Sequence, residues 1–478
     1  MLFNSFVFII FFPIVFGLYW FVFKKNLKVQ NSFLLLASYI FYGWWDWRFL
    51  FMIAFSSFLD FYVGQKIENA DRKNLKKLWL WVSIVINIGF LGYFKYANFF
   101  IDSFVRALEQ LGFQANITSL QIILPVGISF YTFQTLSYSL DIYKGKMKAT
   151  KDPIVFFAYV SFFPQLVAGP IERAADLLPQ FFKSRVFDFD KAKSASRQIL
   201  WGFFKKMVVA DTCAGHANYI FANHDSLQGS LLLLGAIYFA FQIYGDFSGY
   251  SDIAIGTARL LGFDLMTNFD MPYFSKNVAE FWKRWHISLS SWFRDYVYIP
   301  LGGNRRSLLR NILNVFVVFT LSGFWHGANW TFIIWGALNG LFFIPLFVFG
   351  KNKVKLETVS YNRWFPSIKE LFQMGWTFFL ICITWVFFRA ESLGKAINYL
   401  ANIFDKSIFS NPVNPNLSYL PLLFISLLLS IEWINRNKQH QFDIAWLPFW
   451  MRWPVYFIFL GLIVQFGQGD VSFIYFQF

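Results

Sequence analysis

Long apolar segments, separated by short polar ones, recur from one end of the chain to the other. Because an α-helix needs about 20 apolar residues to cross the hydrocarbon core of a bilayer, these segments predict membrane helices. The predicted helices cover residues 2–23, 30–45, 48–65, 78–95, 120–142, 231–256, 312–346, 371–389, 418–434 and 454–468. The block 312–346 is too long for one crossing, so we expect two helices or a deeply buried hairpin there. The pattern predicts an all-α polytopic membrane protein, with residues 1–478 as one transmembrane domain of about 10 to 12 membrane-embedded segments.

Basic residues gather in short loops between these segments. Residues 24–28, 66–77 and 143–151 are rich in Lys and Arg, whereas residues 45–47 and 101–118 are poor in them. Since Lys and Arg remain on the cytoplasmic side of a membrane, strict alternation predicts an extracytoplasmic N-terminus. The first apolar stretch has neither a basic segment ahead of it nor a small-residue cleavage site, so we expect a retained helix.

One apolar segment breaks the alternation. Residues 153–170 contain Pro164, Gly169 and Pro170, and a charged stretch follows from Glu172 onward. If that stretch is also cytoplasmic, the segment enters and leaves on the same side, which requires surrounding protein or a water-filled cavity. An ordinary helix kinked at a proline explains the pattern equally well.

The composition excludes a soluble globule. Apolar residues make up 57% of the chain and charged residues 14%, against roughly 25% charged in soluble domains. The formal net charge of +15 lies mainly in the short loops, so membrane topology explains it and no nucleic-acid partner is expected. The two cysteines, Cys213 and Cys382, indicate neither a disulfide framework nor a metal site.

Residues 268–310 mix aromatic side chains with Lys283, Arg284, Arg294, Arg305, Arg306 and Arg310. Such a segment suits the headgroup level of a membrane, as an interfacial anchor. It also suits an anionic donor, whose phosphates would contact the guanidinium groups. The turn from Pro300 to Arg306 lacks the spacing of a phosphate-binding loop.

A histidine lies within the apolar block, in the segment SGFWHGANW at residues 322–330. Ionisable residues at membrane depth are costly and mark functional sites, and a neutral imidazole can accept and return a proton near pH 7. If one helix continues through His326, then Ser322, Asn329 and Trp330 share its face. The small residues Gly323, Gly327 and Ala328 would let a neighbouring helix approach. A histidine that only bridges two helices is the alternative.

His286, 40 residues earlier in the basic segment, is the second candidate, whereas His216, His224 and His440 lie in polar or interfacial contexts. Other acyl-transfer patterns are absent: the segment 244–252 places Asp246 where a nucleophile elbow needs glycine, and no histidine is followed after four residues by Asp. Asp246 and Asp252 are candidate buried partners, proton carriers or helix-end residues. The pair Asp188 and Asp190 would suit a metal-dependent glycosyltransferase, although chance explains it better.

Several motifs together resemble the membrane-bound O-acyltransferase family, in particular its alginate O-acetylation branch. They are SFYTFQTLSYSLDIYKG (129–145), FFPQLVAGPIER (162–173), YGDFSGYSDIAIG (244–256), FWKRWHISLSSWFRDYVYIPLGGNR (281–305), SGFWHGANWTFIIWGALNG (322–340) and FIYFQF (473–478). The resemblance implies a ring of tilted helices around a funnel or tunnel in the bacterial inner membrane.

The resemblance also implies a reaction. His326 and His286 would be the catalytic residues, with acetyl-CoA as the donor and no permanently bound cofactor or metal. Binding candidates on the matched motifs are Trp325, Asn329, Trp330, Arg284, Trp285, Arg294, Asp295 and Arg305. An extracytoplasmic SGNH-like partner, working beside membrane lipids, would place the acetyl group on an exported polysaccharide. The alternatives are transfer of acetyl to peptidoglycan or of D-alanine, and a transporter or flippase that makes no bond.

Overall fold

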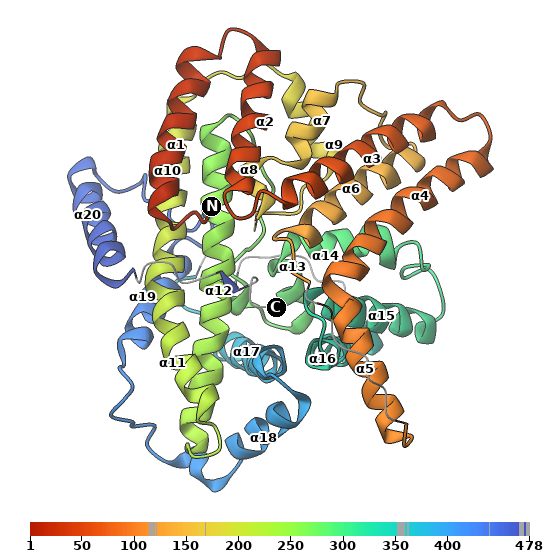
Figure 1. Cartoon of the computed structure of the whole chain (residues 1–478). Helices are drawn as coiled ribbons and strands as arrows, with labels where there is room; N and C mark the ends of the chain where they lie inside the picture. The colour runs from red at the N-terminus through yellow and green to blue at the C-terminus, as the bar shows by residue number, and fades with distance from the viewer. Residues whose placement is uncertain are drawn as a thin grey trace. The chain divides into compact units, whose positions relative to one another are not determined.

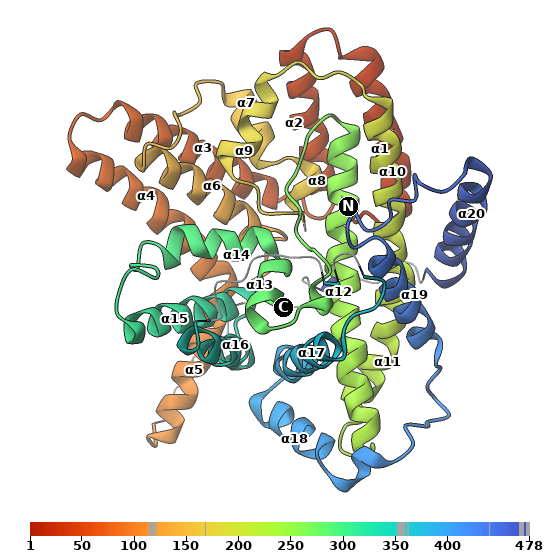
Figure 2. The ribbon, with the colours of Figure 1, turned by 180° about the vertical axis from the view of Figure 1, so that it is seen from behind.

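The computed structural model describes residues 1–113, 120, 122–167, 169–350, 359–360, 363–438, 440–467 and 473–474. Every regular element in these ranges is helical, which confirms the predicted all-α class (Figures 1 and 2). The chain folds as two compact units. Unit 1 comprises residues 1–192 and 257–266, and unit 2 comprises residues 193–256 and 267–478. A single domain over the whole chain, and a ring of helices around a funnel, remain predictions.

Unit 1 contains the first helices of the chain. They are α1 (Phe6–Gly17), the π-helical turn η1 (Leu18–Val22), α2 (Leu27–Gly43), α3 (Phe49–Asn69), α4 (Lys73–Leu91), η2 (Gly92–Tyr96), α5 (Ala97–Gln110), α6 (Ile128–Tyr143), α7 (Pro153–Val160), α8 (Phe163–Leu166), α9 (Ala174–Leu177) and η3 (Leu178–Phe182). Two long helices, α10 (Phe189–Phe203) and α12 (Gly229–Leu260), have residues in both units.

Unit 2 contains the remaining elements. They are η4 (Phe204–Ala210), α11 (Asp211–Ala222), η5 (Pro272–Phe274), α13 (Val278–Arg284), α14 (Ile287–Phe293), η6 (Arg294–Tyr298), α15 (Leu308–His326), α16 (Trp330–Val348), α17 (Ile368–Arg389), α18 (Leu393–Ile403), η7 (Lys406–Phe409), α19 (Leu420–Ile434) and α20 (Phe449–Phe466). The block 312–346 therefore forms two helices, as predicted.

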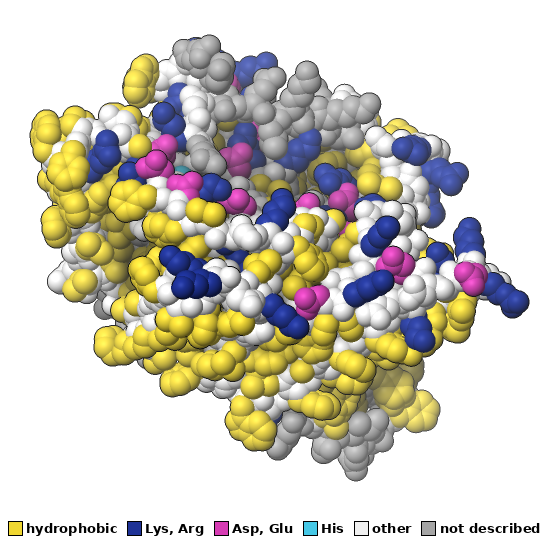
Figure 3. All heavy atoms as spheres, turned by 90° about the horizontal axis from the view of Figure 1, so that it is seen from above, with side chains coloured by type: hydrophobic (Ala, Val, Ile, Leu, Met, Phe, Trp, Pro, Cys, Tyr) yellow, Lys and Arg dark blue, Asp and Glu magenta, His cyan; other side chains and the backbone are white. Residues whose placement is uncertain are grey.

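Among the described residues, six helices are long and apolar enough to cross a membrane. They lie at Lys73–Gln110, Gly229–Leu260, Leu308–His326, Trp330–Val348, Ile368–Arg389 and Phe449–Phe466. Shorter apolar helices lie at Phe6–Val22, Pro153–Leu166 and Leu420–Ile434. In the view of Figure 3, Lys and Arg side chains lie among Asp and Glu side chains, next to an area of hydrophobic ones. This is the pattern of a multi-pass membrane protein.

The expected helix over residues 120–142 begins later than predicted. Residues 122–127 are not helical, and α6 starts at Ile128 after Gly127, whose φ is +76°. Only glycine adopts this left-handed conformation without strain. A Cβ atom at this position would also lie 2.8 Å from the Leu166 carbonyl oxygen. The prediction was wrong for the start of this helix because backbone geometry, not hydropathy, determines it.

The segment 153–170 is broken rather than kinked. Helix α7 ends at Val160 and α8 covers only Phe163–Leu166, while Ala168 lies outside the described residues. Asp152 caps α7 by accepting a hydrogen bond from the Val155 N–H at 3.2 Å. An irregular backbone is consistent with a re-entrant segment, which remains a prediction.

Candidate active site

His326 is the last residue of α15. Gly327 is extended, and Asn329 caps α16 by accepting a hydrogen bond from the Thr331 N–H at 3.1 Å. The expectation that Asn329 and Trp330 share a helical face with His326 is therefore wrong, because the helix ends between them. Trp330 is half exposed at the start of α16, whereas Ser322 does lie one turn before His326. The histidine thus lies at a sharp corner between two helices.

Helices α15 and α16 form a hairpin with closely packed backbones, side by side in Figures 1 and 2. A Cβ atom on Gly323 would lie 2.2 Å from the Phe332 carbonyl oxygen, and one on Gly336 would lie 2.3 Å from that of Phe319. The predicted role of Gly323 is confirmed, because a larger side chain would force the helices apart. This contact fixes the corner that carries His326.

Aromatic rings surround the His326 imidazole, which is 4% exposed. Its ring centroid lies 4.8 Å from that of Trp325, 5.1 Å from that of Trp335 and 5.4 Å from that of Phe388. Trp335 also stacks on Trp385 at 5.6 Å. Such a wall excludes water, which strengthens electrostatic interactions with the imidazole.

The structure brings His286 next to His326, with ring centroids 6.4 Å apart. His286 lies between α13 and α14 with φ +44° and ψ +54°, a left-handed conformation that few residues other than glycine adopt. It is 1% exposed, and burial lowers the pKa of His286 to about 3, so the ring is neutral. Two buried imidazoles, 40 residues apart in the sequence, therefore meet in unit 2.

Asn268 holds the ring of His286. Its Oδ1 atom accepts hydrogen bonds from the Ser288 N–H at 3.3 Å and the Ser288 hydroxyl at 2.8 Å, and lies 3.1 Å from His286 Nδ1. Because this oxygen only accepts, Nδ1 carries the proton and Nε2 keeps its lone pair. Nε2 is buried and has no hydrogen-bond partner in the described part of the chain. Sequence reasoning missed Asn268, which no spacing pattern marks.

Arg284 is buried and paired with two carboxylates. Its guanidinium lies 2.9 Å from Glu280 Oε1 and 2.8 Å from Asp270 Oδ2. The pairing joins α13 to the segment that carries Asn268, since the Asp270 N–H also donates to the Arg284 carbonyl at 2.9 Å. Trp285 is likewise buried and packs on Trp385 at 5.1 Å. These contacts favour a positioning role for both residues.

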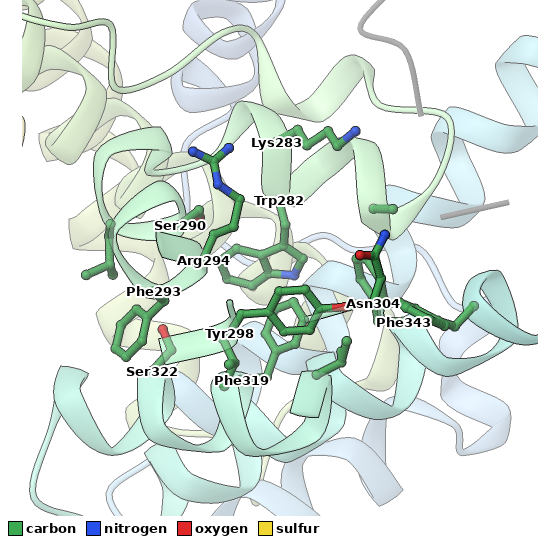
Figure 4. A pocket seen from close by; sticks show the side chains of 15 residues that line it. Trp282, Lys283, Ser290, Phe293, Arg294, Tyr298, Asn304, Phe319, Ser322 and Phe343 are labelled. Carbon is green, nitrogen blue, oxygen red and sulfur yellow. The ribbon is translucent and has the colours of Figure 1, made fainter. Parts of the chain in front are cut away.

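A pocket of about 600 Å³ opens beside α13, α14, η6, α15 and α16. Figure 4 shows Trp282 in its wall, with Lys283 and Arg294 on one side and Phe319 and Ser322 on the other. Arg294 is exposed and pairs with Asp295 at 2.7 Å. The exposed Arg305 does not line the pocket. The pocket thus combines an apolar interior with cationic side chains.

This pocket is linked to His326 through two tryptophans. The Trp282 ring lies 5.7 Å from the Trp335 ring, which contacts His326. Trp282 Nε1 donates a hydrogen bond to Asn339 Oδ1 at 3.3 Å, and Asn339 Nδ2 donates to the Trp335 carbonyl at 2.8 Å. This tryptophan pair lies between the pocket and the histidine, so a molecule in the pocket would have to displace the pair to reach His326.

A buried ionic cluster lies in the same unit. Lys206 Nζ lies 2.8 Å from a carboxylate oxygen of Asp211 and 2.8 Å from one of Asp246. The other oxygen of Asp246 accepts a hydrogen bond from the Ile474 N–H at 2.6 Å. Phe473 contacts Phe247, whose ring meets His286 edge-on at 4.6 Å. Asp246 is therefore a buried partner, and the rest of the motif FIYFQF, residues 475–478, lies outside the described residues.

The remaining polar candidates have structural explanations. Asp252 is a buried partner that pairs with Lys205 and accepts a hydrogen bond from Gln198 at 2.8 Å. Asp188 caps α10 by accepting hydrogen bonds from the Asp190 and Lys191 N–H groups. A helix cap accounts for the Asp pair without a metal.

Comparisons with known proteins agree with the motifs. The family model for membrane-bound O-acyltransferases matches residues 149–352. A probable alginate O-acetylase of Pseudomonas aeruginosa is 42% identical over 83% of this chain and 73% of its own. Peptidoglycan O-acetyltransferase of Helicobacter pylori is 33% identical over 100% of this chain and 98% of its own. Teichoic acid D-alanyltransferase of Bacillus subtilis is 28% identical over 56% of this chain and 69% of its own.

Proposed function

We propose that this chain, which belongs to the membrane-bound O-acyltransferase family and is an acyltransferase, moves acetyl from cytoplasmic acetyl-CoA across the bacterial inner membrane to O-acetylate an exported, alginate-like polysaccharide. The observation that carries the proposal is the pair of buried imidazoles, His326 and His286, with ring centroids 6.4 Å apart. The similarity to an alginate O-acetylase over most of both chains supports the choice of acyl group and acceptor.

The donor, cytoplasmic acetyl-CoA, enters from the cytoplasmic side. The pocket beside Trp282 suits the arm of acetyl-CoA, because its interior is apolar while Lys283 and Arg294 would attract phosphates. Arg305 and Asp295 lie on the same connection, outside the pocket lining, and would contact or orient the donor from there. Arg284 and Trp285 hold the segment in place.

His326 acts as the general base. It takes the proton of an acceptor hydroxyl, the hydroxyl oxygen attacks the thioester carbonyl carbon, and the C–S bond breaks as the proton passes to the departing sulfur. His286 orients the reactants through the Nε2 lone pair that Asn268 keeps free of a proton. Trp325 and the neighbouring aromatic rings exclude water, which would otherwise hydrolyse the donor. Asn329 and Trp330 shape the corner after the histidine.

An extracytoplasmic SGNH-like partner completes the transfer to the polymer. A second acceptor, peptidoglycan, is favoured by one observation: the similarity to peptidoglycan O-acetyltransferase extends over 98% of that protein. Transfer of D-alanine is less well supported, because that relative matches 56% of this chain. A flippase would move a precursor without breaking a thioester, so thioester consumption separates the two classes of function.

The test uses purified full-length protein in lipid vesicles with acetyl-labelled CoA outside. We expect wild-type protein to release CoA as the labelled acetyl group passes to an acceptor hydroxyl, and His326→Ala to lose this activity while remaining folded and inserted. His216→Ala is the matched control, since the ring of His216 makes hydrogen bonds with the Thr212 carbonyl and the Ser418 N–H. Equal activity in His326→Ala and wild type would remove His326 from the mechanism.

A further inference from the structure

A second cavity, of about 660 Å³, lies in unit 1, and none of its lining residues belongs to the proposed acyl-transfer site. It is lined by residues of α9, η3 and the start of α10, by the connection between η3 and α10, by Trp20 of η1, and by residues at and after the end of α12. Four basic side chains, Lys183, Arg185, Lys191 and Arg259, and three acidic ones, Asp176, Asp188 and Asp264, face it. The lining therefore carries a small excess of positive charge.

Arg185 is the residue that sets this cavity apart. Its guanidinium lies 4.8 Å from the centre of the Phe263 ring and 5.6 Å from that of Tyr19, and donates to Asn31 Oδ1 at 2.5 Å. Its Nε and Nη1 atoms are buried and make no hydrogen bond in the described part of the chain, and no carboxylate there pairs with it. Burial lowers the pKa of Arg185, and only the ring of Tyr19 opposes this effect. A half-buried cation without a counter-ion attracts an anion.

Two of the three acidic side chains of the cavity already have partners of their own, and the third, Asp176, is exposed to solvent. Asp264 lies 3.6 Å from Lys191 and 4.0 Å from Arg259, and Asp188 caps α10. Lys183 is exposed at the rim. Since Asp264 faces two cations, Lys191 and Arg259, the positive charge of Lys191 is only partly balanced, and it is left, with that of Arg185 and Lys183, for an external anion.

Large apolar side chains point outward next to the same cavity. Phe182 is 52% exposed, Val186 83%, Phe187 44% and Phe189 67%. Alternation of such side chains with basic ones is typical of a segment at the membrane interface, where apolar groups enter the acyl chains and cations meet the headgroups. A soluble phosphate ester would use the cations but not these apolar side chains.

We infer that this cavity binds the phosphate headgroup of an anionic membrane phospholipid. Lys183 and Lys191 contact the phosphate above the half-buried Arg185, and Val186, Phe187 and Phe189 lie against the acyl chains. The bound lipid would fix the connection between η3 and α10. This site is separate from the acyl-transfer pocket and does not depend on the proposed reaction.

The test measures lipid binding to the purified full-length protein by native mass spectrometry. Dioleoyl phosphatidylglycerol and dioleoyl phosphatidylcholine are titrated against wild type, against the double variant Lys183→Gln/Lys191→Gln, and against the matched control Lys25→Gln/Lys28→Gln, whose lysines flank the start of α2. Each basic side chain near an anionic lipid surface is worth about a fivefold change in affinity. We expect phosphatidylglycerol to bind more tightly than phosphatidylcholine. The double variant Lys183→Gln/Lys191→Gln, called the rim variant below, should bind phosphatidylglycerol about 25-fold more weakly than wild type, and the control should bind it within about twofold of wild type.

Glycerol 3-phosphate is the soluble competitor. We expect it to leave the bound phosphatidylglycerol in place, and displacement at similar concentrations would overturn the assignment to a lipid. Equal phosphatidylglycerol affinity in the rim variant and the control would overturn the site. Arg185→Gln tests the role of the half-buried guanidinium as well, but this variant can unfold. The rim variant changes only exposed side chains, so its result decides whether the site exists.

Discussion

The Nδ1 atom of His286 lies 3.1 Å from the Oδ1 atom of Asn268, and this contact determines which nitrogen of the ring carries the proton. This atom is an amide oxygen, which carries no hydrogen and only accepts, and it also accepts two hydrogen bonds from Ser288. Asn268 Nδ2 donates to Ser251 Oγ of α12 at 3.1 Å, which fixes the amide in turn. A series of hydrogen bonds thus links Ser251 of α12, Asn268 and His286, and each group in it acts either as donor or as acceptor in a fixed direction.

Replacing Asn268 should reduce catalysis without abolishing it. In Asn268→Ala the imidazole is free to change tautomer and orientation, so we expect kcat to fall about ten- to a hundredfold with a small change in KM. Steady-state acetyl transfer by protein in vesicles measures both constants. A merely structural role would instead lower the amount of folded protein and leave the kcat of the folded fraction unchanged.

The conservative variant Asn268→Asp tests whether Asn268 acts by orienting the imidazole of His286 or only by filling space beside it. A carboxylate accepts the same hydrogen bonds and stabilises the charged imidazolium, so it raises the pKa of His286. We expect most activity to be retained at high pH, and the acidic limb of the pH–rate profile to move to higher pH. An unchanged profile, with activity as low as in Asn268→Ala, would contradict the proposed role of the amide oxygen.

The close packing of α15 and α16 at Gly323 can be tested by adding one methyl group. Gly323→Ala would place a Cβ atom 2.2 Å from the Phe332 carbonyl oxygen, so the helices must separate. Overpacking of this kind costs about 1–3 kcal/mol, and the displaced corner should also reduce acetyl transfer. Gly375→Ala, in a helix where a Cβ atom meets nothing within 4 Å, is the control and should be neutral or slightly stabilising. Thermal unfolding of both variants in detergent is the measurement, and equal melting temperatures would contradict the packing argument.

Hydropathy predicted most of the fold because each long apolar run can be satisfied only by a helix. The same reasoning failed where backbone geometry decides, as at Gly127, and where a helix ends inside an apolar block, as after His326. His326 was a candidate from the sequence because an ionisable ring is rare at membrane depth, whereas His286 was one because it lies in the basic segment and matches the family's second histidine. Asn268 was missed because an asparagine in a loop has no pattern, and only the folded chain shows what it contacts.

The sequence revealed only part of the ion pairing of Arg284. Its neighbours in the basic segment suggested a phosphate contact, whereas in the structure it is surrounded by Glu280 and Asp270. The spacing of four residues between Glu280 and Arg284 is a visible sign of an ion pair on one helix. The contribution of Asp270 was not visible, because a loop brings it to the helix.

Lys206 should be essential for folding because it neutralises two buried carboxylates. In Lys206→Met, Asp211 and Asp246 would face each other without a cation, and breaking a buried ion pair in this way costs about 3–5 kcal/mol. We expect little folded protein after purification, measured by size-exclusion chromatography of detergent-solubilised samples. The triple variant Lys206→Met/Asp211→Asn/Asp246→Asn removes the stranded charges and should recover folded protein. Equal amounts of folded protein from the single and the triple variant would show that the balance of buried charge does not determine folding.

Glu172 provides a pH-dependent prediction in unit 1. It is buried after α8, and its Oε1 accepts a hydrogen bond from the Met266 N–H at 2.6 Å. Burial raises the pKa of Glu172 to about 8, despite the opposing effect of this hydrogen bond. The folded protein therefore binds a proton that the unfolded chain releases near pH 4.5, so the carboxyl stabilises the fold at low pH and this stability is lost as pH rises toward 8. Glu172→Gln keeps the acceptor oxygen but cannot ionise. We expect its melting temperature to equal that of wild type near pH 4.5 and to exceed it above pH 8, and a constant difference across this range would show that ionisation of Glu172 has no effect on stability.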